Sequence, residues 1–469
     1  MRAALGALFP EAPEPQPAPE PEPKQADIHR SGQRRVLYVA IQVAAVCAGA
    51  AVLLPRIAGI PSWDSLYAED QGVFLFDALA HPWQLFVPYG GYEELVPRLI
   101  GQLVSYLPLA DAAAPFALAG AFIAALCALF IYHAMDGWIR STWLRVLVGA
   151  ALILLPLAPI EIADSGVGTP WYLTIALFFG LLWRPKRWAG LTAAALVAFA
   201  AASSEIFVFI YAPLVLLRLV ALPRWREHAV TAGWLAGLLV QVPVVLDSYA
   251  QHTQRVGGLA KPVRSVEFYF HNVALRALGW RVSLRLVHLA GLNGATVIVC
   301  AILVAGLCWA LVTGTRQVRV FAVVALIMGF VESIAATTLV PYVLRQPYRV
   351  DFEGGARYAN LPIMAMTAAA VVAVDAYLYR QASAEGVNRI VPLIRRSPRA
   401  LAAVTALACV LAIGWLPDYR YVTPRITWGH WQPAAERMLT ACEHSTTGTI
   451  TTWTWYHRTI TIPCSQLRR

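Results

Sequence analysis

Long apolar segments recur along the chain, and short stretches between them hold most of the charged residues. Each segment is close to 20 residues long, the length at which an α-helix crosses the hydrocarbon core of a bilayer. The segments lack the short alternating pattern of a transmembrane β-barrel. The pattern therefore predicts an all-α polytopic membrane protein with about 11 transmembrane helices. The predicted spans are residues 36–54, 115–134, 145–160, 169–183, 188–203, 206–222, 229–246, 295–313, 320–341, 358–379 and 400–416.

One further apolar segment, Leu95–Leu109, does not fit this series. If it crossed the membrane, the next four basic loops would all move to the outer side, against the usual placement of arginine and lysine in cytoplasmic loops. It also carries Pro97, Arg98 and Pro108. We therefore expect a helix that lies at the outer surface, or one that enters the membrane and returns.

Composition supports this class and sets the expected topology. The chain is 58% apolar and 14% charged, whereas a soluble domain is about 25% charged. Its net charge of +10 is explained by arginines in the predicted cytoplasmic loops, as the positive-inside rule expects, so a nucleic-acid partner is not expected. The outer segments 247–292, 342–357 and the tail also contain arginines, which suits an anionic ligand on that face. Arg34 and Arg35 precede the first span. We expect a multi-pass protein of a bacterial inner membrane, with a cytoplasmic N-terminus and an extracytoplasmic C-terminus.

The two ends of the chain differ from the membrane domain, which we assign to residues 36–416. Residues 1–35 include the Pro/Glu-rich run "PEAPEPQPAPEPEPK", which predicts a disordered cytoplasmic arm. Residues 417–469 contain "TGTITTWTWYHRTITIPC", two alternating runs that predict a β-hairpin. Cys442 and Cys464 flank this module, and an extracytoplasmic tail would allow a disulfide between them. Such a bridge stabilises a loop of this length by roughly 3 kcal/mol.

The first outer loop, residues 55–94, is unusually acidic for this chain. Its stretch "SWDSLYAEDQGVFLFDALAHP" holds four carboxylates: Asp64, Glu69, Asp70 and Asp77. The spacing of apolar residues predicts a helix over 67–80, with Asp70 and Asp77 on one face. One interpretation is structural, because acidic residues cap and stabilise helix N-termini. The other is that Glu69 and Asp70 carry chemistry.

A second acidic site follows the third span. Glu161 and Asp164 stand at its outer end in "EIADSGVG", and we expect them to share a cavity with the first outer loop. A carboxylate there can act as a general base on a hydroxyl. Alternatively, Glu69, Asp70 and Asp164 would hold a divalent cation, Mg²⁺ or Mn²⁺. A solvated loop is the structural alternative.

Two carboxylates lie in or beside apolar runs, where an ionisable residue is costly and indicates function. Glu205 follows Ser203 and Ser204 near an outer span end, so we expect it to line the same cavity. Glu332 lies within a span and would either carry function or pair with an arginine of another helix.

The late segment "GGARYANLPIMAM" brings an Arg-Tyr pair into a span from the outer side. The guanidinium group of Arg357 is a rigid fork that matches phosphate oxygens. We expect Arg357 and Tyr358 to bind a lipid phosphate, helped by Arg345 and Arg349 upstream. The alternative is an interfacial anchor that extends to the headgroups. The long outer loop, residues 247–292, contains "RSVEFYFHNVALRALGWRVSLRLVHL", which predicts an amphipathic surface helix.

These features together resemble the GT-C superfamily, polytopic glycosyltransferases that use polyprenyl-phosphate sugars. The resemblance rests on about a dozen membrane segments and on motifs at Glu69-Asp70, Glu161, Asp164 and "RYxxxP", which is Arg357, Tyr358 and Pro362. In that superfamily the first-loop acid is the catalytic base or a metal ligand, and the late arginine holds the donor phosphate. The resemblance thus implies Asp70 or Glu69 as the base and Arg357 as the phosphate ligand. The chain lacks that superfamily's large outer C-terminal domain and an acid-x-acid triplet.

The expected function is transfer of a sugar from a polyprenyl-phosphate donor to a glycan, lipid or protein acceptor, with inversion at the anomeric carbon. Two alternatives remain from the sequence. A transporter or flippase of lipid-linked glycans would use the same outer arginines and Glu332, but we find no internal repeat typical of transporters. A glycan ligase or polymerase would place its key residues in a long outer loop such as 247–292.

Overall fold

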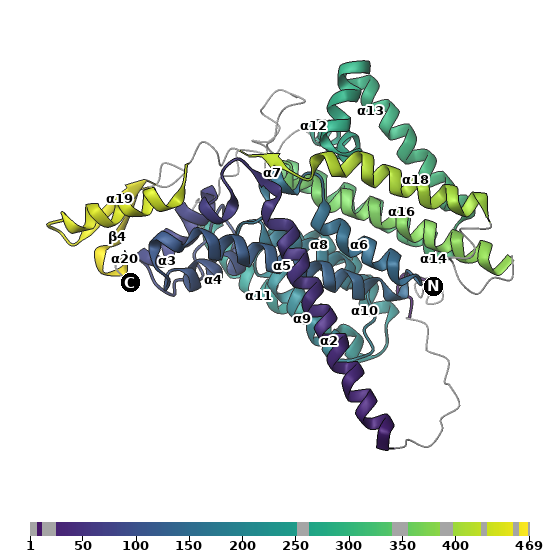
Figure 1. Ribbon diagram of the computed structural model, residues 1–469, viewed down its shortest axis with the longest axis horizontal. Helices are drawn as coiled ribbons and strands as arrows, with labels where there is room; N and C mark the ends of the chain where they lie inside the picture. The colour runs from purple at the N-terminus through teal and green to yellow at the C-terminus, as the bar shows by residue number, and fades with distance from the viewer. Residues whose placement is uncertain are drawn as a thin grey trace.

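The computed structural model describes residues 7–11, 25–250, 262–339, 355–384, 397–423, 429–453 and 459–467. These form a helical bundle from which α13 and α18 project at one side and a small C-terminal module at another (Figure 1). Within the described residues, eight helices are long and apolar enough to cross a membrane. They are α2 (Gln25–Leu53), α5 (Ala113–Ala134), α6 (Thr142–Leu154), α11 (Ala229–Ala250), α13 (Trp280–Thr313), α14 (Arg316–Leu339), α16 (Arg357–Ala384) and α18 (Pro398–Trp415).

The polytopic helical class is therefore confirmed, whereas the count of eleven spans is not. The three remaining predicted spans do fold as apolar helices, but each is shorter than the bilayer requires. They are α8 (Thr169–Leu182), α9 (Trp188–Ala202), and η6 (Ile206–Tyr211) with α10 (Ala212–Ala221). Every residue of α8 is buried, as expected of a helix that is apolar all round. Shorter elements are η1 (Leu54–Arg56), η2 (Ser62–Asp64), η4 (Leu109–Asp111), η5 (Met135–Gly137), α7 (Ala158–Glu161), η7 (Trp225–His228) and η10 (Leu416–Asp418).

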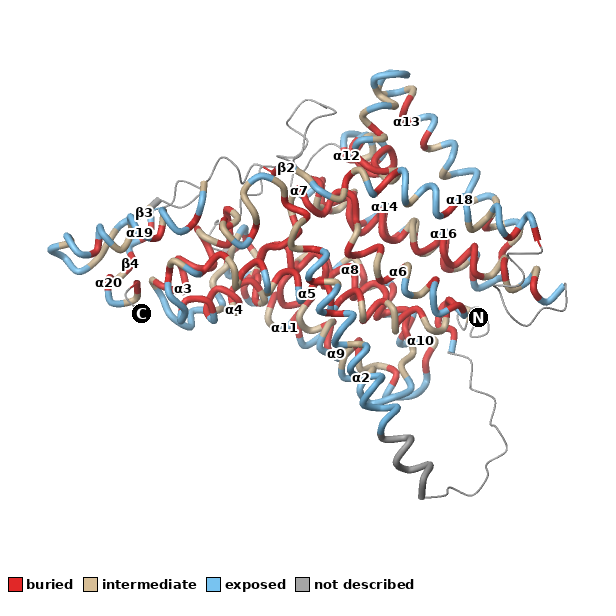
Figure 2. The backbone as a smooth tube through the Cα atoms, viewed as in Figure 1, coloured by how far each residue is buried: buried red, intermediate tan, exposed pale blue. Residues whose placement is uncertain are grey.

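Burial separates the protein core from the surface that faces lipid. The backbone of α8 and the middle of α16 run through the buried interior, whereas much of α13 and, from residue 33 on, most of α2 are exposed (Figure 2). The exposed side chains of α2 are apolar, among them Val36 and Ile41. In a chain of this composition a bilayer covers such a surface, because lipid tails are as apolar as the side chains they meet.

The first outer loop folds as the sequence predicts, with one difference. The helix over 67–80 forms, but its first part is a π-helix, η3 (Asp70–Leu75), before α3 (Phe76–Ala80). The next helix, α4 (Leu95–Val104), is too short to cross a membrane and packs on η3, consistent with the expected non-spanning segment. A Cβ atom on Gly101 would lie 2.5 Å from the Phe74 carbonyl oxygen, so the close approach of these two helices requires glycine.

The prediction of one continuous amphipathic helix in loop 247–292 is wrong. The segment divides into α12 (Pro262–Phe268), η8 (Tyr269–Ala274) and η9 (Leu275–Leu278), and α13 then begins at Trp280. The break falls at Gly279, which has φ +104°, a conformation that favours glycine. A Cβ atom there would lie 2.0 Å from the Gly414 carbonyl oxygen. Contact with α18 therefore overrides the helical periodicity.

The N-terminal segment differs from its sequence prediction, and the C-terminal segment agrees with it. Where the sequence predicts a disordered arm up to residue 35, α2 already begins at Gln25, and Phe9 is buried with its ring near Arg218. At the other end, β3 (Thr449–Trp453) pairs antiparallel with β4 (Thr459–Pro463), as predicted. The Cys442–Cys464 disulfide is present, with its Cα atoms 5.5 Å apart. It joins α19 (Trp431–Glu443) to α20 (Cys464–Leu467).

Arg56 connects the end of the first span to distant parts of the chain. Its side chain is fully buried and donates hydrogen bonds to the carbonyl oxygens of Ile153 (2.5 Å), Leu155 (2.8 Å) and Tyr419 (3.1 Å). Immediately after it, β1 (Ile57–Ala58) pairs in parallel with β2 (Tyr421–Val422). The guanidinium group thus satisfies carbonyls that the end of α6 leaves without helical partners.

We predict that Arg56→Ala lowers the free energy of unfolding by about 3 kcal/mol, because three buried carbonyl groups lose a charged donor. Thermal unfolding in detergent measures the effect. Arg56→Lys keeps the charge but not the planar fork, so we expect an intermediate loss. An Arg56→Ala midpoint equal to that of the wild type would contradict this role.

Candidate functional site

Asp70 joins the first outer loop to the loop after the third predicted span. Its side chain is 1% exposed. The backbone N–H groups of Gly166 and Val167 donate to its two carboxylate oxygens, at 3.0 and 2.8 Å. The two loops are therefore held together by a pair of hydrogen bonds to an acidic side chain, which are stronger than neutral ones.

Small residues in "DSGVG" allow this contact. A Cβ atom on Gly166 would lie 2.9 Å from Asp70 Oδ1, and one on Gly168 would lie 1.9 Å from the Ile162 carbonyl oxygen. Asp164 has φ +53°, which is uncommon for a residue with a side chain. It is buried and accepts a hydrogen bond from the Ser62 hydroxyl at 3.3 Å. Asp164 thus also binds the first outer loop.

Glu161 binds the start of α16. Its carboxylate accepts hydrogen bonds from the backbone N–H groups of Gly355 (3.1 Å) and Arg357 (2.7 Å). The guanidinium Nε of Arg357 lies 3.6 Å from the same carboxylate. Glu161 therefore satisfies the free N–H groups of a helix N-terminus and orients Arg357. The sequence places Glu161 and Arg357 in one site, and the structure brings them into contact.

Tyr358 lies in an aromatic cluster beside Arg357. Its ring packs edge-on against Trp171 and Phe207, with centroid distances of 5.3 and 6.0 Å. The Arg357 guanidinium carbon is 5.7 Å from the Tyr358 ring centroid. Tyr358 is buried, so its main contribution here is to fix the beginning of α16.

Backbone contacts bring Glu94 and Glu205 together. The N–H groups of Leu95 and Val96 donate to the Ser203 carbonyl (3.2 Å) and the Ser204 hydroxyl (3.0 Å). The start of α4 is therefore fastened to the end of α9, immediately before Glu205. Glu205 in turn accepts the Phe207 N–H at 3.3 Å, and Phe207 is the residue that packs on Tyr358.

Three buried carboxylates, Glu69, Glu94 and Glu205, form what we call the acidic cluster. Tyr89 donates to Glu69 at 3.5 Å and Tyr92 donates to Glu94 at 3.1 Å. Burial raises the pKa of Glu94 well above its ordinary value, and the charges of Glu205 and Glu69 raise it further. Burial also raises the pKa of Glu205 to about 7, against the opposing effects of the Phe207 N–H and the Arg357 charge.

Tyr92 lies within electrostatic range of both the acidic cluster and Arg357. Burial raises the pKa of its hydroxyl, the charges of Glu205 and Glu94 act in the same direction, and the charge of Arg357 opposes them. These groups are therefore within electrostatic range of one another. The site combines several carboxylates that can take up a proton with one guanidinium group.

Sequence reasoning missed Glu94 and Tyr92. The signal was present, because "GGYEE" places two adjacent acids directly before an apolar segment in an acid-poor chain. Its first acid, Glu93, is also buried, which raises its pKa to about 8, and it lies 3.5 Å from Arg98. Glu332 of α14 has no hydrogen-bond or ion-pair partner among the described residues, so the predicted arginine pairing is not found there.

The remaining predicted ligands do not assemble in the described parts of the chain. Arg345 and Arg349 lie outside the described residues. Within the described ranges, Glu69, Asp70 and Asp164 do not form a group of three side chains that could hold a metal ion. Asp70 and Asp164 instead bind the polar groups of neighbouring loops.

The fold and site define a multi-pass helical membrane protein with a buried acidic cluster next to an anchored arginine. No family model, curated protein or solved structure matches the chain. Its function is therefore argued from the site alone.

We predict different effects for the two neighbouring acids of the first outer loop. Asp70→Asn replaces one acceptor oxygen with an amide donor that faces a backbone N–H, so stability falls by about 2 kcal/mol. Glu69→Gln still accepts from Tyr89 and should lower stability less than Asp70→Asn does. Thermal unfolding in detergent distinguishes the two variants. Equal midpoints for Asp70→Asn and the wild type would contradict the structural role of Asp70.

We also predict that Glu205 makes stability depend on pH. Its folded pKa of about 7 lies above the ordinary value of 4.5, so its contribution is fully present below pH 4.5 and is lost as pH rises through 7. Glu205→Gln should remove this loss and stabilise the protein at pH 8 by up to about 3 kcal/mol. The measurement is thermal unfolding of both proteins at pH 5 and 8. A difference that does not change with pH would exclude this titration.

Proposed function

We propose that the protein is a glycosyltransferase that uses a polyprenyl-phosphate sugar on the outer face of a bacterial inner membrane. The observation that carries this proposal is the position of Arg357, held by Glu161 within electrostatic range of the acidic cluster. Transfer from a lipid phosphate needs a base for the acceptor and a cation for the leaving phosphate. Both kinds of group occur together at this site.

In the proposed reaction, a carboxylate of the acidic cluster takes the proton of an acceptor hydroxyl. The hydroxyl oxygen then bonds to the anomeric carbon, and the bond from that carbon to the phosphate oxygen breaks. The leaving polyprenyl phosphate carries the negative charge, which the guanidinium group of Arg357 stabilises. A single displacement of this kind inverts the anomeric centre.

Access and hydrogen bonding support Glu69 or Glu94 over Asp70 as the base. Asp70 is 1% exposed and both of its oxygens already accept backbone N–H groups, so an acceptor hydroxyl has little access to it. The Glu69 carboxylate accepts a hydrogen bond from the Tyr89 hydroxyl, and the Glu94 carboxylate accepts one from the Tyr92 hydroxyl, so each already meets hydroxyl donors of the kind an acceptor would present. Asp70 then serves as a positioning residue. It keeps the loop that bears Glu161 next to the acidic cluster.

A transporter of lipid-linked glycans is the second candidate, and Glu332 is the observation that favours it. Its carboxylate is fully buried in α14 and no described residue hydrogen-bonds to it. Intramembrane carboxylates of this kind mark ion or substrate paths. A transporter would depend on Glu332 and move its substrate without releasing polyprenyl phosphate.

The test measures polyprenyl phosphate released from a panel of polyprenyl-phosphate sugars by the purified protein in liposomes. We expect Arg357→Ala to reduce release at least 100-fold, on the order reported for losing a transition-state charge ligand. Glu69→Gln or Glu94→Gln should reduce it by a factor of about 100 or more. Arg437→Ala and Glu436→Gln, on the exposed part of α19, are matched controls that should retain full activity.

Several outcomes separate the two candidates. Release that is unchanged in Arg357→Ala, or absent for every donor, would contradict a transferase. Movement of a lipid-linked glycan across the liposome that is lost in Glu332→Gln, with no phosphate released, would instead support the transporter.

A further inference from the structure

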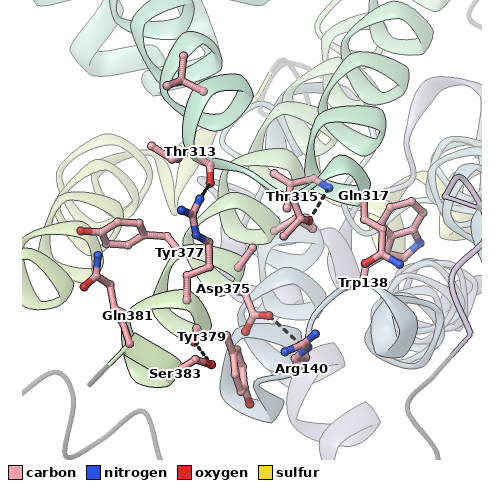
Figure 3. Close-up of a pocket in the computed structure, with 16 residues that line it drawn as sticks. Trp138, Arg140, Thr313, Thr315, Gln317, Asp375, Tyr377, Tyr379, Gln381 and Ser383 are labelled. Carbon is pink, nitrogen blue, oxygen red and sulfur yellow. Dashed lines mark hydrogen bonds between the residues drawn. The ribbon is translucent and has the colours of Figure 1, made fainter. Parts of the chain in front are cut away.

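A polar cavity lies at the end of α16 opposite to Arg357. Arg380, in this cavity, is about 34 Å along the helix from Arg357 at a rise of about 1.5 Å per residue. The cavity has a volume of about 600 Å³. Thr313 of α13 and Tyr377 of α16 line one side, and Trp138 and Arg140 line the other (Figure 3). It is therefore a separate site, about a membrane thickness away from Arg357 along α16.

The charge of this cavity is positive. Asp375 is the one acidic residue among its described lining, and its two oxygens accept the N–H groups of Arg140 and Ser141 at 2.9 and 3.1 Å. The guanidinium groups of Arg140 and Arg380 lie over the Tyr379 ring and at the Thr313 carbonyl. The N-terminus of α14 adds partial positive charge. Trp138 is 8% exposed, and no described residue accepts a hydrogen bond from its Nε1. Two guanidinium groups, a helix N-terminus and an indole N–H are all donors or positive charges that can bind a phosphate.

An apolar groove continues from this cavity along α13, α16 and α18. Tyr377 lines both, and its ring packs on Trp309 with a centroid distance of 5.4 Å. The groove has a volume of about 680 Å³. On α18 it extends from Arg399 to Val410, about 16 Å along the helix axis. This length matches one leaflet, half of a hydrocarbon core of about 30 Å.

We propose that the cavity and the groove together bind one anionic phospholipid. Its phosphate lies between Arg140 and Arg380, which are exposed at the membrane boundary, and an acyl chain fills the groove. A purely polar ligand would leave the groove empty, and a neutral lipid would leave two guanidinium groups with Asp375 as the one acid in the described lining to balance them. The lipid also explains how α18 is held, because few of its residues are buried by protein: Ala400, Leu407, Gly414 and Trp415.

The headgroup is tested with the full chain purified in detergent. Native mass spectrometry compares retention of phosphatidylglycerol, of phosphatidylethanolamine with the same acyl chains, and of polyprenyl phosphate. We expect phosphatidylglycerol to be retained in preference to phosphatidylethanolamine. The double variant Arg140→Gln, Arg380→Gln should bind it at least tenfold more weakly. Arg187→Gln, an exposed arginine at the N-terminus of α9, should bind it as the wild type does.

The groove is tested separately at Gly306, where a Cβ atom would have nothing within 4 Å. Gly306→Trp should fill the groove and prevent lipid retention, whereas Gly306→Ala should retain it. Unfolding midpoints measured without added lipid show whether each variant is folded. Equal retention of the two phospholipids by the wild type would overturn the proposal. So would preferential retention of polyprenyl phosphate, or wild-type binding by the double variant or by folded Gly306→Trp.

Discussion

The carboxylate of Asp70 and the two backbone N–H groups that it accepts control the geometry of the candidate site. Because the partner loop is short, fixing Gly166 and Val167 also fixes Glu161 a few residues earlier. Glu161 then holds the first residues of α16, including Arg357. A buried ionic group costs free energy unless it is paired. Asp70 accepts two backbone N–H groups, and Glu161 is paired with backbone N–H groups and with Arg357. The resulting order places the guanidinium group beside the acidic cluster.

α16 connects the two ends of the molecule that carry charge. Its N-terminus holds Arg357 in the candidate site, its buried middle packs against α14, and its last turns carry Asp375 and Arg380. A helix interior has no unpaired backbone groups, so polar chemistry in this bundle collects where helices begin and end. This explains why acids and arginines that are far apart in sequence meet at helix termini. It also separates a proposed catalytic end from a proposed lipid-binding end.

Much of the fold could be predicted from the sequence, because apolar length and helical spacing report on local structure directly. The described residues of the eleven predicted spans fold mainly as helices, and the hairpin and the Cys442–Cys464 bridge form. The number of membrane crossings stays a prediction, because eight helices among the described residues are long enough to span, whereas α8 is as apolar as a span but shorter and buried by protein. The helix predicted across Gly279 failed because a close contact with Gly414 imposes a positive φ there.

For the site, residue type beside apolar runs was enough to name Glu69, Glu161, Glu205 and Arg357 as candidates, since charged groups there are rare, and the structure brings Glu161 into contact with Arg357. Their roles were decided only by tertiary contacts. Asp70 and Asp164 look like chemical groups in sequence, but backbone and hydroxyl donors from another loop occupy them. Glu94 looks like an ordinary loop acid in the sequence, but burial and the nearby charge of Glu205 raise its pKa, so it holds a proton more readily. Sequence records which groups are costly to bury, and only the fold determines which partners they meet.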